Sequence, residues 1–521
     1  MKIIQSYWSK PSQGQNEGYI ENRHTGGWLT PQYHFMSWAL SCLSFRQFYD
    51  EVELYTDAEG KALLIDTLQL PYTKVHVVMD RLNHLPPLLW TAPKIYTYSL
   101  QKEPFIHADG DVYIWKKFDT AIEQAPLLAQ SLEDNFAYYD DVLSILEKQN
   151  FWVPPAIAAI DRASSNLQTV NAGVFGGSDI AFIHAYCKDL LRFYINNKEP
   201  LAGNGVGKLN PLDQFYFYHL TLEKNRPIGL LFPGEKHDFS ELMLFNLVPQ
   251  YQSYIHLLGA TKKNSLYCKM VALHLRHQFP DYYDKLASIL TPKMPLPPTQ
   301  EQPNFEAFFP SSLAALHRFD AATTVNDSKA LSTALHNNMA LAEKPELHAL
   351  VQQIFMSEDA RYQLYCHGAA LPNEEERLPA FARAKALLAA TTPNDKSALL
   401  QQSFVLSKAV RILALEYDVL QLTAQPDWVN LTAATIPEPG QYIYLYVKHD
   451  TATVLTYPMG DSNQLLYYFS EGPFSGAALI DLLMEDEADK TDAATLAYYT
   501  DMVFYFITNN AIFTGYLDFA D

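Results

Sequence analysis

Two carboxylates that lie close together in the sequence are the first residues that could do chemistry. The stretch FIHADGD, residues 105–111, ends an apolar run with Asp109 and Asp111, separated only by Gly110. Side chains two apart on an extended strand point to the same face, so we expect both carboxylates to converge on one point, with Gly110 leaving room beside them. Such a pair repels, and a divalent cation relieves the repulsion. The pair therefore predicts a metal site, although capping of a loop is the commoner role of so short a motif.

Two further segments carry polar residues beside small or aromatic ones. NAGVFGG, residues 171–177, places Asn171, which offers a donor and an acceptor, next to Ala172 and Gly173, where backbone can approach a ligand closely. A tight turn between a strand and a helix explains this segment equally well. NPLDQFYF, residues 210–217, puts Asp213 and Gln214 just before an aromatic helix, and only the aspartate is needed as a helix cap.

One histidine in this half of the chain is a candidate metal ligand. YIHLLGATKK, residues 254–263, presents His256 after an apolar run, followed by Gly259 and Lys262. A lone histidine in such a position belongs more often to the core or the surface than to a metal site. The glycine and the lysine that follow it favour a loop that binds an anion.

Taken together and in this order, the four segments resemble the motifs of glycosyltransferases with the GT-A fold. The resemblance is closest to the glycogenin-like and lipopolysaccharide galactosyltransferase-like retaining family, in which D-x-D ends a strand and is followed by N-A-G, D-Q and H-x-x-G-x-x-K. It covers about the first 285 residues and none of the remainder.

The resemblance implies a metal-dependent transferase that takes its sugar from a nucleotide-diphosphate sugar, by analogy a UDP-sugar. The ion would be held by Asp109, Asp111 and His256, and a mixed oxygen and imidazole shell favours Mn²⁺ over Mg²⁺. The diphosphate would complete this shell, with Lys262 as a second positive centre. The residues expected to contact the donor are Tyr7, Trp8, Lys94, Asp109, Gly110, Asn171, Ala172, Gly173, Gly259 and Lys262.

The resemblance also assigns two catalytic positions. Asp213 would accept hydrogen bonds from sugar hydroxyls, and Gln214 would face the anomeric carbon. An amide is a poor nucleophile, which leaves a double displacement without an obvious agent. The resemblance implies front-face transfer with retention of configuration. The alternative on the same fold is a catalytically inactive protein that binds a sugar or a peptide, which would not need all three metal ligands.

Three of the expected donor contacts have simpler explanations. Tyr7 and Trp8 directly follow a strand and could stack on the base, but buried aromatics at strand ends are the commoner pattern. Lys94 opens a helix and could reach a phosphate, and a solvent-facing lysine explains it as well.

These residues require an α/β domain that brings distant segments together. Apolar runs predict strands over residues 2–8, 51–57 and 74–80, and Thr30-Pro31 predicts the start of a helix. A second helix is expected over 92–101, which gives a Rossmann-like, nucleotide-binding order of elements. Along the first helix Trp38, Cys42 and Phe45 recur at helical spacing, which favours a core role over a cofactor contact.

The remaining chain predicts three further parts. Residues 286–304 form a proline-rich linker, 305–425 a helical domain, and 426–521 a small α+β domain. The last part combines an expected hairpin over 441–460, a third strand at QLLYYFS (464–470) and two helices over 476–486 and 492–513, an order that resembles winged-helix domains that bind leader peptides. This resemblance implies a ribosomally made peptide as acceptor, captured by strand addition, and a structural or oligomerisation module is the alternative.

Composition limits the partners and the compartment. The chain has 521 residues with a formal net charge of −20 and no long Lys/Arg run, which argues against nucleic acid and anionic membranes as partners. Its 33 Tyr and 29 Phe indicate well-filled cores, and its four cysteines, far apart, suggest neither a zinc site nor disulfides. With no signal-like or membrane-spanning apolar stretch, we expect a soluble, cytoplasmic protein whose acceptor is a peptide or a saccharide.

Overall fold

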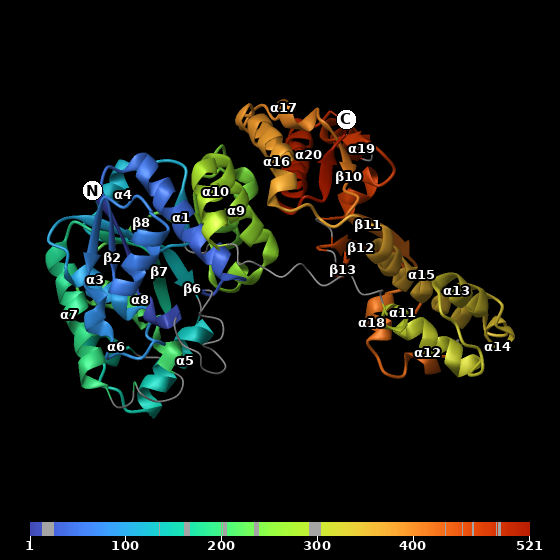
Figure 1. The fold of residues 1–521 in the computed structure, drawn as a ribbon, viewed down its shortest axis with the longest axis horizontal. Coiled ribbons are helices and arrows are strands. Elements are labelled where there is room, and N and C mark those ends of the chain that lie inside the picture. The colour runs from blue at the N-terminus through green and yellow to red at the C-terminus, as the bar shows by residue number, and fades with distance from the viewer. Residues whose placement is uncertain are drawn as a thin grey trace. The chain divides into compact units, whose positions relative to one another are not determined.

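The structure is a computed structural model of the whole chain, and it divides into two compact units, Met1–Pro292 and Lys293–Asp521. Each unit is considered by itself (Figure 1). The residues that the structure describes are 1–12, 26–134, 136–160, 167–198, 201, 206–233, 239–290, 304–432, 434–450, 452–460, 463–485, 487 and 491–520. The predicted linker over 286–304 falls largely outside them.

The first unit is built on a mostly parallel sheet. Among the described residues it has seven strands in the order β3-β2-β1-β4-β7-β6-β8. Only β7 runs antiparallel to its neighbours β4 and β6. The strands are β1 (Lys2–Tyr7), β2 (Val52–Thr56), β3 (Lys74–Val77), β4 (Phe105–Ala108), β6 (Leu128–Asp134), β7 (Gln168–Gly177) and β8 (Gly229–Leu230). The predicted strands over 2–8, 51–57 and 74–80 are thus confirmed.

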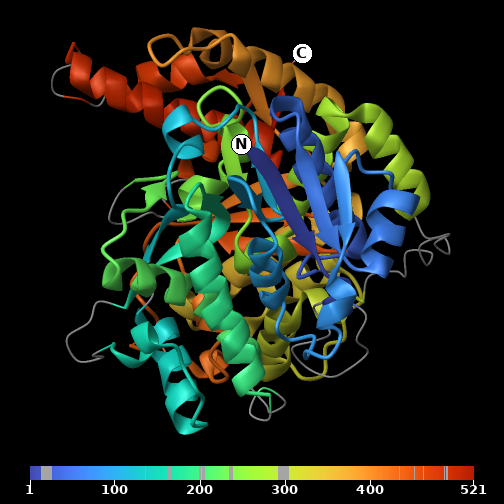
Figure 2. The ribbon, with the colours of Figure 1, turned by 90° about the vertical axis from the view of Figure 1, so that its left-hand side faces the viewer.

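Helices lie on both faces of this sheet (Figures 1 and 2). They are α1 (Pro31–Phe48), α2 (Ala58–Lys61), α3 (Ala92–Ser99), α4 (Thr120–Glu123), α5 (Phe136–Lys148), α6 (Pro155–Ala158), α7 (Ile180–Asn196), α8 (Leu212–Glu223), α9 (Ser265–Gln278) and α10 (Pro280–Leu290). The expected helix starts at Pro31 and Ala92 are confirmed, each with a proline in its first turn.

The alternation of apolar residues along the central strands explains the two helical layers. Ile4 and Phe105 belong to one core, shared with α3, α5, α7 and α8, and Ile3 and Ile106 belong to a second core that contains Phe45 of α1. Because side chains alternate between the faces of a strand, both faces of the sheet are buried. This leaves the ends of the strands as the place where polar residues can meet.

A two-stranded antiparallel sheet extends one of these ends. β5 (Val112–Ile114) follows β4 after a turn and pairs with β9 (Tyr254–His256). The pairing joins residues 140 or more positions apart in the chain, with Val112 opposite His256. It fixes the position of the segment after β4.

The second unit contains more strand than expected. Its helices are α11 (Phe305–Phe308), α12 (Pro310–Phe319), α13 (Ser328–His336), α14 (Met339–Ala342), α15 (Pro345–His367), α16 (Glu374–Ala389), α17 (Ser397–Leu400), α18 (Val419–Thr423), α19 (Gly476–Glu485) and α20 (Ala493–Thr508). Its strands are β10 (Ser403–Leu406), β11 (Val410–Leu415), β12 (Tyr442–Lys448), β13 (Val454–Pro458), β14 (Phe474–Ser475) and β15 (Leu517–Phe519). They form the sheets β14-β10-β15 and β11-β12-β13.

Two predictions for this unit need correction. The range 305–425, expected to be helical, includes β10 and β11, which pair with strands beyond residue 440. QLLYYFS, expected to be a strand, contains a 3₁₀ helix, Gln464–Phe469, because Leu466 and Phe469, three residues apart, are the ones that are buried. The hairpin β12-β13 and the helices α19 and α20 are confirmed.

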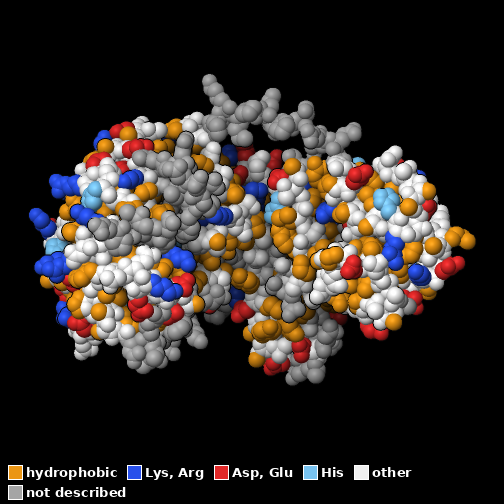
Figure 3. All heavy atoms as spheres, turned by 90° about the horizontal axis from the view of Figure 1, so that it is seen from below, with side chains coloured by type: hydrophobic (Ala, Val, Ile, Leu, Met, Phe, Trp, Pro, Cys, Tyr) orange, Lys and Arg blue, Asp and Glu red, His pale blue; other side chains and the backbone are white. Residues whose placement is uncertain are grey.

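The described surface carries mixed charge. On the face seen in Figure 3, Lys and Arg side chains are scattered among acidic and hydrophobic ones. Among the described residues, the structure contains no helix long and apolar enough to span a bilayer.

Candidate active site

The two aspartates lie in the turn between β4 and β5. The prediction that they occupy one extended strand is therefore wrong: β4 ends at Ala108, and Val112 N donates to Asp109 O at 3.2 Å to close the turn. The chain turns here because β4 belongs to the main sheet whereas β5 pairs with β9. The two carboxylates still converge, although they lie in a turn and not on a strand.

One face of α1 holds this turn in place. Ser37 Oγ donates to Gly110 O at 2.7 Å, and Ser41 Oγ donates to Val112 O at 2.7 Å. The Trp38 ring packs so closely on Gly110 that a Cβ there would lie 2.5 Å from it, so no larger residue fits. Trp38 thus contacts the turn rather than serving only as core, whereas Cys42 and Phe45 are fully buried as expected.

His256 reaches the turn through the β5-β9 pair. Leu257 N donates to Asp111 O at 3.1 Å, and the His256 Nε2 atom lies 3.5 Å from Asp111 Oδ1. One ligand atom from each of Asp109, Asp111 and His256 lies within 4.8 Å of the others, so the cluster could hold a divalent metal ion. The prediction that a distant histidine joins the couplet is confirmed by this geometry.

The donor set fits a metal ion. His256 Nδ1 lies 2.6 Å from Gln130 Oε1, which also accepts from the Tyr254 hydroxyl at 2.6 Å. A proton on Nδ1 leaves the Nε2 lone pair directed at the couplet, the arrangement that metal-bound histidines adopt. Asp111 Oδ1 is buried and has no hydrogen-bond partner among the described residues, so a cation is the group it lacks.

Two lysines balance the couplet. Lys94 Nζ lies 2.7 Å from Asp109 Oδ2, and Lys262 Nζ is paired with Asp111 Oδ2. Burial and the charge of Asp111 raise the pKa of Asp109 against the pull of Lys94. Burial would also raise the pKa of Asp111, but Lys262 and His256 outweigh it and lower that pKa well below its usual value. Asp111 is thus the firmly ionised member of the pair.

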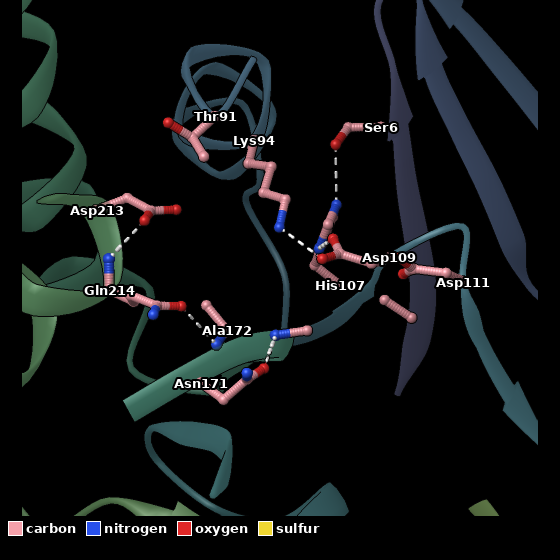
Figure 4. Close-up of polar contacts among 12 residues, drawn as sticks. Ser6, Thr91, Lys94, His107, Asp109, Asp111, Asn171, Ala172, Asp213 and Gln214 are labelled. Carbon is pink, nitrogen blue, oxygen red and sulfur yellow. Dashed lines mark hydrogen bonds and ion pairs between the residues drawn. The ribbon is translucent and has the colours of Figure 1, made fainter. Parts of the chain in front are cut away.

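The NAG segment lies within β7, beside the turn, and not in a turn of its own. Gly173 O accepts from Asp109 N at 2.9 Å, which continues the β4-β7 ladder. A Cβ on Gly173 would lie 2.2 Å from His256 Cε1, so the close approach expected of this glycine is made to the histidine ring. Asn171 Oδ1 accepts from Gly173 N at 2.8 Å (Figure 4).

Asp213 and Gln214 lie in the first turn of α8, with Pro211 at the N-cap. Asp213 Oδ1 accepts from Gln214 N at 2.7 Å, and burial raises the pKa of Asp213 to about 6 although Lys94 opposes it. Gln214 Oε1 accepts from Ala172 N at 3.2 Å (Figure 4). Asp213 is therefore not the N-cap that the sequence suggested: it lies inside the helix, and its side chain accepts from the backbone N–H of the next residue.

A single cavity of about 620 Å³ collects these residues. Of the predicted site residues it is lined by Tyr7, Trp8, Lys94, Asp109, Gly110, Asp111, Asn171, Ala172, Gly173, Gln214, His256, Gly259 and Lys262. Asp213 is not among its lining residues and is buried. Trp28 and Trp90 add aromatic surface to the wall. Tyr7 and Trp8 are each only 5% exposed.

Sequence reasoning missed two residues that act on this site. Glu133, at the end of β6, accepts hydrogen bonds from Asn171 and Gln214, and its position follows only from the β6-β7 pairing. His34 lines the cavity, with Nε2 accepting from the Trp38 indole at 3.0 Å and burial lowering its pKa to about 3. A signal for His34 was present, because His34, Ser37 and Ser41 recur at helical spacing among apolar residues.

The fold and the site define an α/β protein with a candidate metal centre at the end of a mostly parallel sheet. The chain belongs to the family of unknown function DUF6734, whose profile matches residues 1–289. Among solved structures, mouse xyloside xylosyltransferase 1 in its apo form is similar, with 11% identity and a TM-score of 0.26 over 44% of this chain and 84% of that one. A score this low does not establish a shared fold. No curated protein matches the chain.

Proposed function

We propose that the first unit is a metal-dependent glycosyltransferase with a GT-A-like fold, which moves a sugar from a nucleotide-diphosphate sugar to an acceptor. The observation that carries the proposal is the meeting of Asp109, Asp111 and His256 in one cavity, with a lysine beside each aspartate. We further propose Mn²⁺ as the ion, a UDP-sugar as the donor and retention of anomeric configuration, as the sequence resemblance implies.

The charge of the cavity supports an anionic ligand. Among the described lining residues, five are formally charged: Lys94, Lys262, Lys263, Asp109 and Asp111. In a chain of net charge −20, an excess of lysines in one cavity is unusual. A divalent ion adds two further positive charges, so the loaded site needs a ligand with more than one negative charge. A nucleotide diphosphate meets this need.

The residues of the cavity are suited to the departure of a diphosphate. A bound divalent ion supplies Lewis-acid stabilisation of the leaving phosphates. Lys94 and Lys262 now pair with the aspartates, and with an ion held by these aspartates their ammonium groups would be able to donate charge-assisted hydrogen bonds to phosphate oxygens. Tyr7 and Trp8 at the end of β1 provide an apolar surface for the base.

The sugar would lie over the NAG segment, between the metal centre and α8. Asn171, Gly173 and Gln214 all line this part of the cavity. Asp213 keeps the first turn of α8 in place through its bond to Gln214 N. Asp213 is not a lining residue of the cavity, and its expected hydrogen bonds to sugar hydroxyls stay a prediction.

The test is a panel of nucleotide sugars incubated with the protein, with and without Mn²⁺, in which nucleotide release is followed. Metal-dependent release from one donor, lost in Asp111→Asn and kept in the surface variant Asp66→Asn, supports the proposal. Binding of a donor with no release points to the inactive binding protein instead. If the protein neither binds any donor of the panel nor releases nucleotide from it, the proposal is contradicted.

The acceptor stays a prediction. The sequence suggests a ribosomally made peptide that adds as a strand to the second unit. β13, at the edge of the described sheet β11-β12-β13, exposes Leu455 and Tyr457, as an edge that accepts a strand would. Binding of candidate leader peptides to the full chain, compared with a variant carrying Thr456→Pro in β13, tests this step, because proline removes a backbone donor.

A further inference from the structure

A partly buried carboxylate, Glu133, joins two residues of the candidate site that are far apart in the chain. Its Oε1 accepts from Asn171 Nδ2 at 2.7 Å. Its Oε2 accepts from the Tyr139 hydroxyl at 2.8 Å and from Gln214 Nε2 at 2.8 Å. Glu133 and Tyr139 are not among the residues that line the cavity, whereas Asn171 and Gln214 are. The carboxylate therefore acts on the cavity only through its partners.

These bonds decide which way the Gln214 amide faces. Burial raises the pKa of Glu133, and the hydrogen bonds donated by Asn171, Tyr139 and Gln214 oppose this by favouring the ionised form. As an ionised carboxylate Glu133 only accepts hydrogen bonds, so the NH₂ end of Gln214 is the end that points to it. Its second hydrogen is directed to the Tyr139 oxygen at 2.6 Å, which leaves neither hydrogen for a ligand. The opposite end, Oε1, accepts only from Ala172 N at 3.2 Å and keeps a lone pair beside the cavity-lining Ala172.

The same carboxylate orients Asn171. Because Nδ2 is held by Glu133, Asn171 Oδ1 is the atom that accepts from Gly173 N, two residues further along β7, at 2.8 Å (Figure 4). Tyr139 in turn is fixed by its ring, which stacks on Phe215 with centroids 4.9 Å apart. Each donor of the network has an acceptor, so the amides cannot turn over without breaking a bond.

We propose that Glu133 is a positioning residue that holds the Gln214 carbonyl oxygen toward the sugar of the donor. The inference rests on the proposed function. A carbonyl oxygen at this place attracts positive charge, and positive charge develops on the anomeric carbon and ring oxygen when the bond to the diphosphate breaks. An amide turned the other way would present its NH₂ group and oppose that charge.

The isosteric change Glu133→Gln tests this. It keeps the volume but replaces one acceptor oxygen by an NH₂ group, so the three donors that face residue 133 can no longer all be satisfied. We expect the Gln214 amide to lose its fixed orientation and kcat for metal-dependent nucleotide release to fall about 10²-fold. Tyr139→Phe removes one of the two partners of the Gln214 NH₂ group, and its kcat for nucleotide release should fall less, about tenfold.

The readout that separates positioning from a structural role is the affinity for Mn²⁺ with UDP, which carries no sugar. We expect Glu133→Gln to bind Mn²⁺ and UDP within about threefold of wild type, as measured by calorimetry, while kcat falls. The control is Glu358→Gln in the second unit, another partly buried carboxylate, which accepts two backbone N–H bonds. This change should lower the melting temperature and leave kcat unchanged.

Two results would overturn the inference alone: an active wild type whose Glu133→Gln variant keeps kcat within about threefold, or a variant that loses Mn²⁺ and UDP affinity as much as kcat. A wild type that neither binds UDP with Mn²⁺ nor releases nucleotide from any donor overturns the proposed function together with the inference. The two failures are therefore distinguishable.

Discussion

Two groups of polar residues face each other across the candidate site and differ in how well they are satisfied. The charged cluster, Lys94, Asp109, Asp111, His256 and Lys262, contains Asp111 Oδ1, a buried oxygen without a hydrogen-bond partner among the described residues. The amide network, Glu133, Tyr139, Asn171 and Gln214, has a partner for each side-chain donor.

Because the two groups differ in how well they are satisfied, we expect them to have different roles: one binds ligands and the other keeps a fixed orientation. Both aspartates are paired with lysines, but the buried oxygen Asp111 Oδ1 has no hydrogen-bond partner in the part of the chain that the structure describes, which is unfavourable, so the charged cluster gains from binding a cation. A bound cation would in turn leave the lysines to attract an anion. A network without free donors gains nothing from a ligand, and its value lies in keeping one orientation. We therefore expect changes in the charged cluster to act first on the binding of metal and diphosphate, and changes in the amide network to act first on the rate.

The largest effect is expected for Asp111→Asn. The variant removes the firmly ionised ligand and leaves Lys262 without its partner, so Mn²⁺ affinity and nucleotide release should both fall by about 10²-fold or more. Mn²⁺ binding is measured by calorimetry or electron paramagnetic resonance. Asp66→Asn, at an exposed ion pair with Lys61, is the control and should leave both unchanged. Unchanged Mn²⁺ affinity in Asp111→Asn would remove the charged cluster from consideration as a metal centre.

The next effect concerns Asp213, which accepts from Gln214 N beside the amide network and whose ionised form is disfavoured by burial. Its pKa of about 6 in the folded protein exceeds the value of about 3.9 expected when unfolded, because burial disfavours the ionised form. The folded state then binds the proton more tightly, so the stability contributed by the neutral acid is present below about pH 4 and is lost as pH rises through about 6.

Asp213→Asn should therefore stabilise the protein at pH 7.5, by about 3 kcal/mol at most, while it lowers activity. The amide oxygen of asparagine can still accept from Gln214 N. Urea unfolding of the metal-free protein at several pH values measures the effect, and the gain should disappear toward pH 4. A gain that does not depend on pH would mean that packing, not charge, is the cause.

A third prediction tests the contact between the two groups. Gly173 of β7 lies against the His256 ring, and an added Cβ would be 2.2 Å from Cε1. His256 is held by Gln130, so Gly173→Ala should displace the ring and lower Mn²⁺ affinity about tenfold, with a loss of about 1–3 kcal/mol of stability from overpacking. Gly460→Ala, where nothing lies within 4 Å, is the matched control. An unchanged Mn²⁺ affinity would show that the ring is not a ligand.

The charged cluster could be predicted from the sequence far better than the amide network. D-x-D is a local pattern, and the later histidine and lysine follow a recognisable spacing, so Asp109, Asp111, His256 and Lys262 were all named. Glu133 carries no such signal, since one glutamate at the end of LAQSLED looks like any surface residue. Its role depends on the β6-β7 pairing and on α8, which begins about 80 residues later.

The fold shows the same division between local and distant information. β1, β2 and β3 follow from apolar runs of β-branched and aromatic residues, and α1 from its Thr-Pro start. β10 and β11 were missed because their short segments follow a long helical stretch and are stabilised by β14, β15 and β12, far along the chain. Strand pairing at that separation leaves no mark in a local window.

The smallest effect, and the one that divides the charged cluster itself, is expected for Lys262→Gln. Lys262 now neutralises Asp111, and with an ion bound it would be free to donate to a phosphate. Removing its charge should weaken UDP binding about fivefold in the presence of Mn²⁺. It should not weaken Mn²⁺ binding in the absence of nucleotide, because Asp111 then has no competing cation. Calorimetric titrations with each ligand measure the two effects, and Lys116→Gln, at an exposed pair with Asp119, is the control. A parallel loss of both affinities would mean that Lys262 holds the turn between β4 and β5 in shape, and that it does not exchange between the aspartate and the diphosphate.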